Sequence, residues 1–357
     1  MYRFRKDLEN KEAVQLQVPR KRIMMSLNES SLNPLGLIME NFQNNLSSVS
    51  LNRYFSSITD KLMESLQDYI GYGISKEEIL VGNGADQMLF YLFLSLRDKG
   101  ENFALSLAPS YFDYSSYSST VGLGFQTLTL NKDFDFSPQE FLAKGDDENC
   151  RLLIICYPNN PTGNLFPEEK ILKVIKKSAV PVLLDETYYE FSGKTFMDKI
   201  ADFDNLIILR SFSKSFSSAG VRFGYLVSAE KNIREIRKVF LASNLSLLVQ
   251  TFAYSLLEKR DLFLEHNKNV MELRNKLFQQ LNALDEVTVY PSETNFLIFS
   301  AGKKTQELFE YLGKNDISVR SMHKLPLLEN HLRVTVSTEA DNNYFLEKLQ
   351  EFITKQN

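Results

Sequence analysis

The run Leu206-Ile207-Ile208-Leu209-Arg210-Ser211-Phe212-Ser213-Lys214-Ser215 joins an apolar stretch to a loop that is rich in hydroxyl groups. The apolar residues predict a buried strand, and the loop that follows carries Lys214 and, eight residues later, Arg222. A lysine amine forms a Schiff base with a carbonyl, whereas serine hydroxyls and an arginine fork suit a phosphate. Taken alone, the run is more typical of a solvated Ser-rich loop; together with other motifs, it would predict a site for a ligand that has both an aldehyde and a phosphate.

Similar apolar runs lie upstream and predict further strands at 79–81, 103–107, 152–156 and 180–184. Strands that are apolar on both faces, separated by stretches of helical spacing such as 85–96 and 167–177, are typical of a parallel sheet covered by helices. We therefore expect an α/β core.

The chain beyond this core has a different pattern. Helical periodicity runs through 228–284, and strands are expected near 296–299, 317–319 and 332–336. A smaller α+β unit fits this pattern. No linker of Pro, Gly and Ser separates the two parts, so we expect them to pack tightly.

Composition and charge exclude several classes of protein. With 357 residues the chain is long enough for two domains. It has 41 basic and 45 acidic residues, a net charge of −4, and no basic block, which argues against a general nucleic-acid binder. Neither an uninterrupted apolar run of membrane length nor the apolar core of a signal peptide is present, so we expect a cytoplasmic protein.

The cysteines and histidines have no ligand spacing. There are two cysteines and three histidines, which argues against a disulfide scaffold and a structural metal and indicates a reducing compartment. We interpret Cys156 as a small core residue at a strand end, and His323 as structural or solvent-facing.

Three further motifs follow the predicted strands. The turn Val81-Gly82-Asn83-Gly84-Ala85-Asp86-Gln87 precedes a helix, and its free amides can hold a phosphate. Asp185 ends an apolar strand, where ligands bind in open α/β sheets, and a pyridinium nitrogen is one partner that a buried carboxylate can have there. Asn159-Asn160-Pro161-Thr162-Gly163 follows the strand at 152–156. Each motif alone is a weak signal, whereas their order and spacing together are specific.

In this order the motifs resemble those of the fold-type I pyridoxal-phosphate enzymes, and among them the class I/II aminotransferases of the histidinol-phosphate aminotransferase group. The resemblance runs from residue 26 to the end of the chain. It implies a three-layer, mostly parallel sheet in a large cofactor domain, with a smaller α+β domain, as in aspartate aminotransferase. We expect the large domain to span 34–257 and the small one to combine 1–33 with 258–357.

The resemblance also implies roles for individual residues. Lys214 would hold pyridoxal 5′-phosphate as an internal aldimine and then act as the general acid and base of transamination. Asp185 would pair with the pyridine nitrogen, and Asn160 and Tyr188 would bind the phenolic oxygen. Since the chain has no Trp, Tyr111 would be the ring that stacks on the cofactor. The phosphate would be held by Gly84, Ala85, Asp86, Ser211, Ser213 and Arg222.

Further residues would bind the substrate or the partner subunit. Arg333 matches the arginine that binds the substrate carboxylate, for which a guanidinium fork is suited. Arg320 would contact the distal end of the substrate, and Asn28 lies in the family's N-terminal substrate motif. Tyr54 matches a tyrosine that reaches the cofactor phosphate of the neighbouring subunit, which implies a homodimer.

The implied reaction moves an amino group to a 2-oxo acid such as 2-oxoglutarate, as in histidine biosynthesis. The donor is histidinol phosphate or an aromatic amino acid. Histidinol-phosphate aminotransferases usually carry a tyrosine before residue 26, but 17–31 holds none, and Arg20, Lys21 and Arg22 occupy the region.

Two rivals use the same fold. A threonine-phosphate decarboxylase would break a different bond at Cα, a choice that the sequence does not reveal. A pyridoxal-phosphate-sensing transcription regulator would need an added DNA-binding segment, for which the pattern that begins near residue 26 leaves no room.

Overall fold

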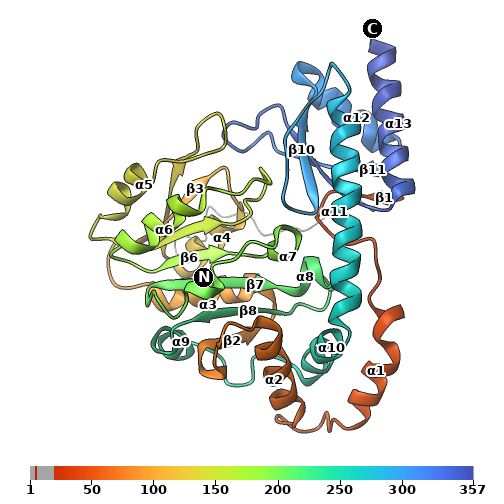
Figure 1. Ribbon diagram of the computed structural model, residues 1–357. Helices are drawn as coiled ribbons and strands as arrows, with labels where there is room; N and C mark the ends of the chain where they lie inside the picture. Colours follow the sequence, from red (N-terminus) through yellow and green to blue (C-terminus); the bar gives the residue numbers. More distant parts are fainter. Residues whose placement is uncertain (1–4, 6–19, 357) are drawn as a thin grey trace, which may run out of the picture.

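The computed structural model describes residue 5 and residues 20–356. The N-terminal residues on which the expectation about a signal peptide rests lie largely outside this part. Its centre is a seven-stranded sheet with helices on both faces (Figure 1). In spatial order the strands are β2 (Ile79–Gly82), β8 (Gly224–Ser228), β7 (Leu206–Ser211), β6 (Val182–Asp185), β5 (Cys150–Cys156), β3 (Phe103–Ala108) and β4 (Gly124–Thr129). From β7 to β4 the neighbours run parallel, whereas β8 is antiparallel to both β7 and β2. The expected three-layer, mostly parallel sheet is therefore present.

Alternate residues of the strands enter two separate cores, because successive side chains of a strand point to opposite faces. In β5, Leu152 and Ile154 belong to one core, and Leu153 and Ile155 belong to the other. The first core is covered by α3 (Gly84–Leu96), α4 (Asp113–Val121) and α9 (Glu230–Arg237). The second is covered by α1 (Leu35–Ser47), α2 (Ile58–Ile70), α5 (Pro138–Gly145), α6 (Glu168–Lys177) and α10 (Leu247–Glu258).

A further core lies in the C-terminal third and includes the start of the described chain. There β1 (Ile23–Met24) pairs in parallel with β11 (Ile317–Ser318). Beside them is an antiparallel sheet of β12 (Arg320–Ser321), β13 (Leu332–Thr335), β10 (Phe296–Ser300) and β9 (Thr288–Val289). The helices of this part are α11 (Arg260–Asn282), α12 (Thr305–Lys314) and α13 (Glu339–Gln356). Residues far apart in the sequence therefore share one apolar core.

The predicted strands are confirmed, with ends that shift by one or two residues, but two strands of the central sheet were not expected, nor were the two-residue strands β1, β9 and β12. β4 is an edge strand whose side chains are exposed or half-buried, so it has no apolar run. β8 follows the lysine loop directly, and its five residues are too short an apolar run to stand out beside that loop. None of the helices in the described part is long and apolar enough to cross a membrane.

A buried ion pair braces the strand ends that carry the predicted cofactor residues. Arg210 at the end of β7 lies 2.9 Å from the Glu186 carboxylate just after β6, and both side chains are almost fully buried. The guanidinium also donates to Thr195 (2.7 Å) and lies 3.7 Å from the centre of the Tyr189 ring. Since a buried charge is costly without its partner, this pair holds the residues after Asp185 against those before Lys214.

Candidate active site

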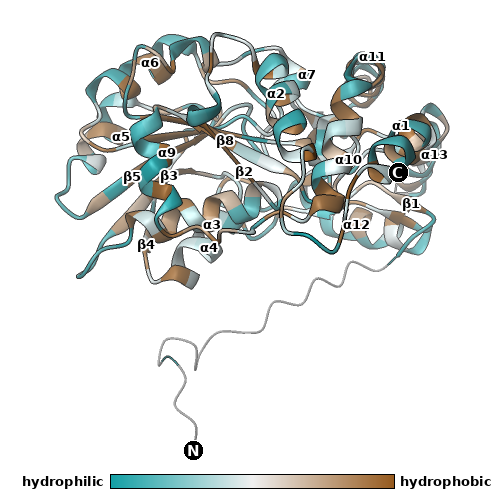
Figure 2. Cartoon of the chain, turned by 90° about the horizontal axis from the view of Figure 1, so that it is seen from below, coloured by the Kyte–Doolittle hydropathy of each residue, from teal (hydrophilic) through white to brown (hydrophobic). Residues whose placement is uncertain are grey.

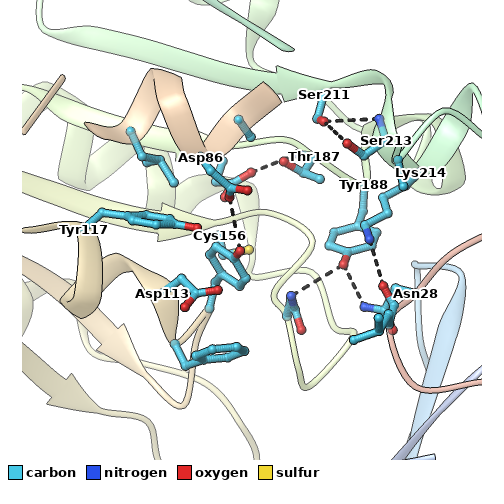
Figure 3. Close-up of a pocket in the computed structure, with 18 of the residues that line it drawn as sticks. Asn28, Asp86, Asp113, Tyr117, Cys156, Thr187, Tyr188, Ser211, Ser213 and Lys214 are labelled. Carbon is cyan, nitrogen blue, oxygen red and sulfur yellow. Dashed lines mark hydrogen bonds between the residues drawn. The ribbon is translucent and has the colours of Figure 1, made fainter. Parts of the chain in front are cut away.

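A cavity of about 260 Å³ opens where β5, β6 and β7 end, and we call it the active-site cavity. Figure 3 shows Lys214, Tyr188 and Asn28 on one side of it and Asp86, Tyr117 and Asp113 on the other. The structure brings together most of the residues that the sequence predicted: Asn28, Ala85, Asp86, Tyr111, Asn160, Asp185, Tyr188, Ser211, Ser213, Lys214, Arg222, Arg320 and Arg333.

Lys214 lies in the short helix α8 (Phe212–Ser215), directly after β7. Its Nζ donates a hydrogen bond to the Leu27 carbonyl oxygen at 2.9 Å. Burial, together with the positive charges of Arg333 and Arg222, lowers the pKa of the amine to about 8. A sizeable fraction of the amine is therefore uncharged at neutral pH, which is the form that attacks an aldehyde carbon.

Asp185 is a buried carboxylate at the end of β6, 4% exposed. Its Oδ2 accepts a hydrogen bond from the Tyr114 hydroxyl at 2.6 Å, and its Oδ1 accepts one from the Thr187 amide at 3.0 Å. Burial raises its pKa, and no cationic side chain of the described residues forms an ion pair with it. A carboxylate placed this way suits a positively charged ring nitrogen, so this part of the cavity fits a pyridine cofactor.

The other end of the cavity is built for an anion. Arg222 lies 2.6 Å from the Asp86 carboxylate at the start of α3, where the helix leaves amide N–H groups unpaired. Ser211 donates to the Ser213 hydroxyl at 3.0 Å. Gly84 does not line the cavity, but a Cβ there would lie 2.6 Å from the Arg222 guanidinium, so glycine makes room for that side chain. These groups fit a phosphate.

The substrate end combines hydrogen-bond donors with a buried guanidinium. Asn28 and Asn160 donate to the Tyr188 hydroxyl at 2.8 and 3.5 Å. Arg333, 7% exposed, donates to the Asn160 side-chain oxygen (2.7 Å) and to the Ser26 carbonyl oxygen (2.9 Å). Its Nε has no hydrogen-bond partner within the part of the chain that the structure describes. Burial and the nearby charge of Arg320 lower the pKa of Arg333 to about 10, so an anionic ligand would stabilise its charged form.

The two tyrosines predicted to bind the cofactor differ in placement. Tyr111 lines the cavity, donates to the Asp86 carboxylate at 3.2 Å and packs against Tyr114. Tyr54 lies outside the cavity and is 80% exposed. Within one chain, Tyr54 is therefore not part of the site, and its contact with a second subunit stays a prediction.

Sequence reasoning missed Tyr114, which contacts Asp185 from behind the lining of the cavity, and several residues that line the cavity. Tyr114 follows Tyr111 by three residues, and the helical i,i+3 spacing is the signal that could have placed both on one face. The contribution of Leu27 is a backbone carbonyl, which no motif reveals. Thr187, Asp113 and Tyr117 also line the cavity.

The interpretations of Cys156 and His323 agree with the structure. Cys156 is buried, and burial raises the pKa of its thiol, which disfavours a thiolate nucleophile. His323 is exposed and interacts with the Ser321 hydroxyl at 3.0 Å. Among residue 5 and residues 20–356, no three His, Cys, Asp or Glu side chains are grouped to hold a metal ion.

The protein-family model described as aminotransferase class I and II matches residues 20–349. The chain belongs to this family. Histidinol-phosphate aminotransferase of Pyrococcus furiosus is 34% identical, with 93% of each chain covered. The protein of the same name from Vesicomyosocius okutanii is 31% identical, with 98% of this chain and 97% of that protein covered.

Solved structures of class I and II aminotransferases have the same fold. Histidinol-phosphate aminotransferase from Clostridium acetobutylicum has a TM-score of 0.83 at 24% identity, covering 93% of this chain and 99% of that one. The Sinorhizobium meliloti protein, solved with pyridoxal-5′-phosphate, also has a TM-score of 0.83, at 20% identity, covering 95% and 92%. The expected fold type I is confirmed, and the protein is an aminotransferase that uses pyridoxal 5′-phosphate.

The buried amine predicts how cofactor capture depends on pH. Because only the uncharged amine attacks the aldehyde, the rate at which the apoprotein captures pyridoxal phosphate should rise with a midpoint near pH 8, about two units below an ordinary lysine. Stopped-flow absorbance measures this rate. Arg333→Met removes a neighbouring positive charge and should move the midpoint upward, whereas Lys303→Met, at an exposed site, should not. A wild-type midpoint near 10 would contradict the assignment.

The Tyr114 hydroxyl predicts a positioning role toward the cofactor. Tyr114→Phe removes the hydrogen bond to Asp185 without opening a cavity, and a bond to a charged group is worth about 1.5–3 kcal/mol. We expect the dissociation constant of pyridoxal phosphate to rise about tenfold, measured by absorbance titration of the apoprotein. Tyr117→Phe, one turn along α4, is the matched control and should change it less than about threefold. Equal affinities in the two variants would show that Tyr114 does not orient Asp185.

Proposed function

We propose that the enzyme transfers the amino group of histidinol phosphate to a 2-oxo acid such as 2-oxoglutarate. The relatives named histidinol-phosphate aminotransferase, which match along nearly the whole chain, support this donor. The observation that carries the proposal is the pair Arg333 and Arg320, which line one cavity with Lys214. A phosphate ester has close to two negative charges at neutral pH, so two guanidinium groups suit it better than a single carboxylate.

The proposed mechanism divides the work among the residues of the cavity. When bound, pyridoxal phosphate supplies the aldehyde that takes up the amino group and a ring that withdraws electrons. The Lys214 amine accepts the proton from Cα of the donor and later returns one, as general base and acid. Asp185 holds a positive charge at the ring nitrogen, and Asn160 and Tyr188 orient the ring. Arg333 binds the anionic group of the donor and so fixes Cα relative to Lys214.

We assign the remaining predicted roles in the same way. The cofactor phosphate is bound by Ser211, Ser213, Arg222, the amides of Ala85 and Asp86, and the turn at Gly84, while Tyr111 stacks on the ring. Arg320 and Asn28 contact the substrate. Of the basic N-terminal group, Lys21 lines a neighbouring cavity and Arg22 lies 4.5 Å from the centre of the Tyr344 ring.

The domain division remains our proposal, with a large domain at 34–257 and a small one of 1–33 and 258–357. The separate apolar core that joins β1 to the C-terminal third supports it. Residues 1–4 and 6–19 lie outside the described part.

We also propose a cytoplasmic location. The buried free cysteines Cys150 and Cys156 support it, since thiols stay reduced in the cytoplasm.

The donor is tested by mixing the holoenzyme with histidinol phosphate, phenylalanine, tyrosine, glutamate or O-phosphothreonine and following the cofactor absorbance. We expect histidinol phosphate to have the highest kcat/KM. Lys214→Ala should lower turnover by about 10³-fold or more, because it removes both the attachment point and the proton carrier. Conversion by phenylalanine without conversion by histidinol phosphate would refute the proposed donor. Release of CO₂ from O-phosphothreonine would indicate a decarboxylase.

We also propose a homodimer in which Tyr54 reaches the partner's cofactor phosphate. Its support is a group of exposed apolar side chains after α1: Leu51 is 56% exposed, Tyr54 80% and Phe55 79%. Such side chains mark an interface. We expect a dimer in sedimentation analysis and weak activity for Tyr54→Ala.

Mixed dimers test whether the contact crosses between subunits. When Tyr54→Ala and Lys214→Ala chains are exchanged, one site of each hybrid has an intact lysine and an intact tyrosine. Activity should therefore rise above that of either parent. A mixture no more active than Tyr54→Ala alone would show that Tyr54 does not act across an interface.

A further inference from the structure

Asp113, the first residue of α4, lies where two cavities meet. One is the active-site cavity. The other, of about 840 Å³, is lined among others by Lys21, Phe309, Glu310 and Lys324, and we call it the outer cavity. Phe112, Asp113 and Arg320 line both. Asp113 therefore lies on the side of the active-site cavity away from Lys214 (Figure 3), where this cavity continues into the outer one.

The Asp113 carboxylate differs from the other two in the active-site cavity. Asp86 is paired with Arg222, and Asp185 accepts hydrogen bonds from Tyr114 and Thr187. No ion pair within 4.0 Å involves Asp113 among the residues that the structure describes. Its polar neighbours are the Tyr111 hydroxyl, the Asp86 carboxylate and the Arg320 guanidinium, and partial burial raises its pKa. A ligand group that donates a hydrogen bond or carries a positive charge would stabilise the ionised form.

The surroundings of this carboxylate are aromatic. The rings of Phe112, Tyr111 and Tyr117 line the same wall, and the Arg320 guanidinium lies 5.6 Å from the centre of the Phe112 ring. A flat ring packs well against such a wall. A ring with N–H groups would also pair with Asp113, whereas a hydrocarbon ring would remove water from the carboxylate without replacing its hydrogen bonds.

We propose that Asp113 selects amino donors whose side chain is a nitrogen-bearing ring of the imidazole class, and that it rejects phenyl rings. The inference rests on the proposed function, because it concerns the side-chain subsite of the same donor. Discrimination follows from desolvation: an analogue without the hydrogen-bonding group leaves the partly buried carboxylate unpaired, and the loss of one hydrogen bond to a charged group corresponds to about 100-fold. Arg320, which also lines both cavities, would bind the anionic group of the same donor.

The test compares donors that differ only in the ring. Histidinol phosphate is paired with phenylalaninol phosphate, and histidine with phenylalanine, with 2-oxoglutarate as acceptor. In whichever of these two pairs the enzyme converts, we expect the wild-type kcat/KM for the imidazole donor to exceed that for the phenyl donor by about 100-fold or more. Asp113→Asn should lower this ratio of kcat/KM values by about tenfold, and Asp113→Leu should bring the ratio below about ten. In both variants the change should come chiefly from a lower kcat/KM for the imidazole donor. Spectral titration with each donor reports binding separately from turnover.

The controls separate selection from folding. Glu310→Gln removes a carboxylate that lines only the outer cavity, and it should leave the ratio unchanged. Unchanged cofactor absorbance and thermal midpoint show that a variant is folded.

The outcomes separate the proposed donor from the role of Asp113. Suppose that the phosphorylated pair is not converted, but that histidine is preferred to phenylalanine and Asp113→Leu abolishes this preference. The proposed donor is then refuted, and the role of Asp113 is supported. Absence of an imidazole preference in the wild type, or a preference that survives in Asp113→Leu, overturns the inference.

Discussion

The active site depends on keeping an amine buried beside two guanidinium groups. A charged Lys214 would be repelled by Arg333 and Arg222 and poorly hydrated, and both effects favour the neutral amine. The same burial that makes this lysine reactive is costly for the charge of Arg333, whereas the Arg222 side chain is partly exposed. Arg222 has Asp86, whereas Arg333 is held by neutral oxygens of Asn160 and Ser26 and keeps one donor free. The charge of Arg333 is therefore not balanced by a carboxylate, and an anionic ligand beside it would balance that charge.

The sheet gives this charge arrangement its rigidity. Asp185 and Lys214 follow neighbouring parallel strands, so both side chains emerge at the same edge. Just beyond, the buried pair of Glu186 and Arg210 ties the two strand ends together. Removing either partner would leave an unpaired buried charge directly beneath the lysine loop. Figure 2 shows strongly apolar strands between helices with hydrophilic outer faces, and this apolar layer is what excludes water from the far side of the ion pair.

The sequence predicted the parts of this site that rest on local patterns. Apolar runs located most of the strands, and polar residues at the ends of those runs marked Lys214, Asp185 and the Gly84 turn. The strands β4 and β8 were missed, because an exposed edge strand and a short run after a loop have no clear periodicity. Tyr114 and Asp113 were missed for another reason. Their roles depend on how α4 docks against the sheet, and this docking brings the Tyr114 hydroxyl to Asp185 across 71 residues of sequence.

The N-terminal segment shows most clearly why a motif comparison is incomplete. It lacks the tyrosine that the group usually carries there, so a comparison of motifs alone counts it as a departure from the group. Yet the segment enters the site chiefly through its backbone: the Leu27 carbonyl accepts from Lys214 and the Ser26 carbonyl accepts from Arg333. Any residue type supplies such carbonyls, provided that β1 pairs with β11 and fixes the register. The absence of one side chain therefore does not remove the segment from the site, and the donor selection that we propose depends on Asp113 rather than on this segment.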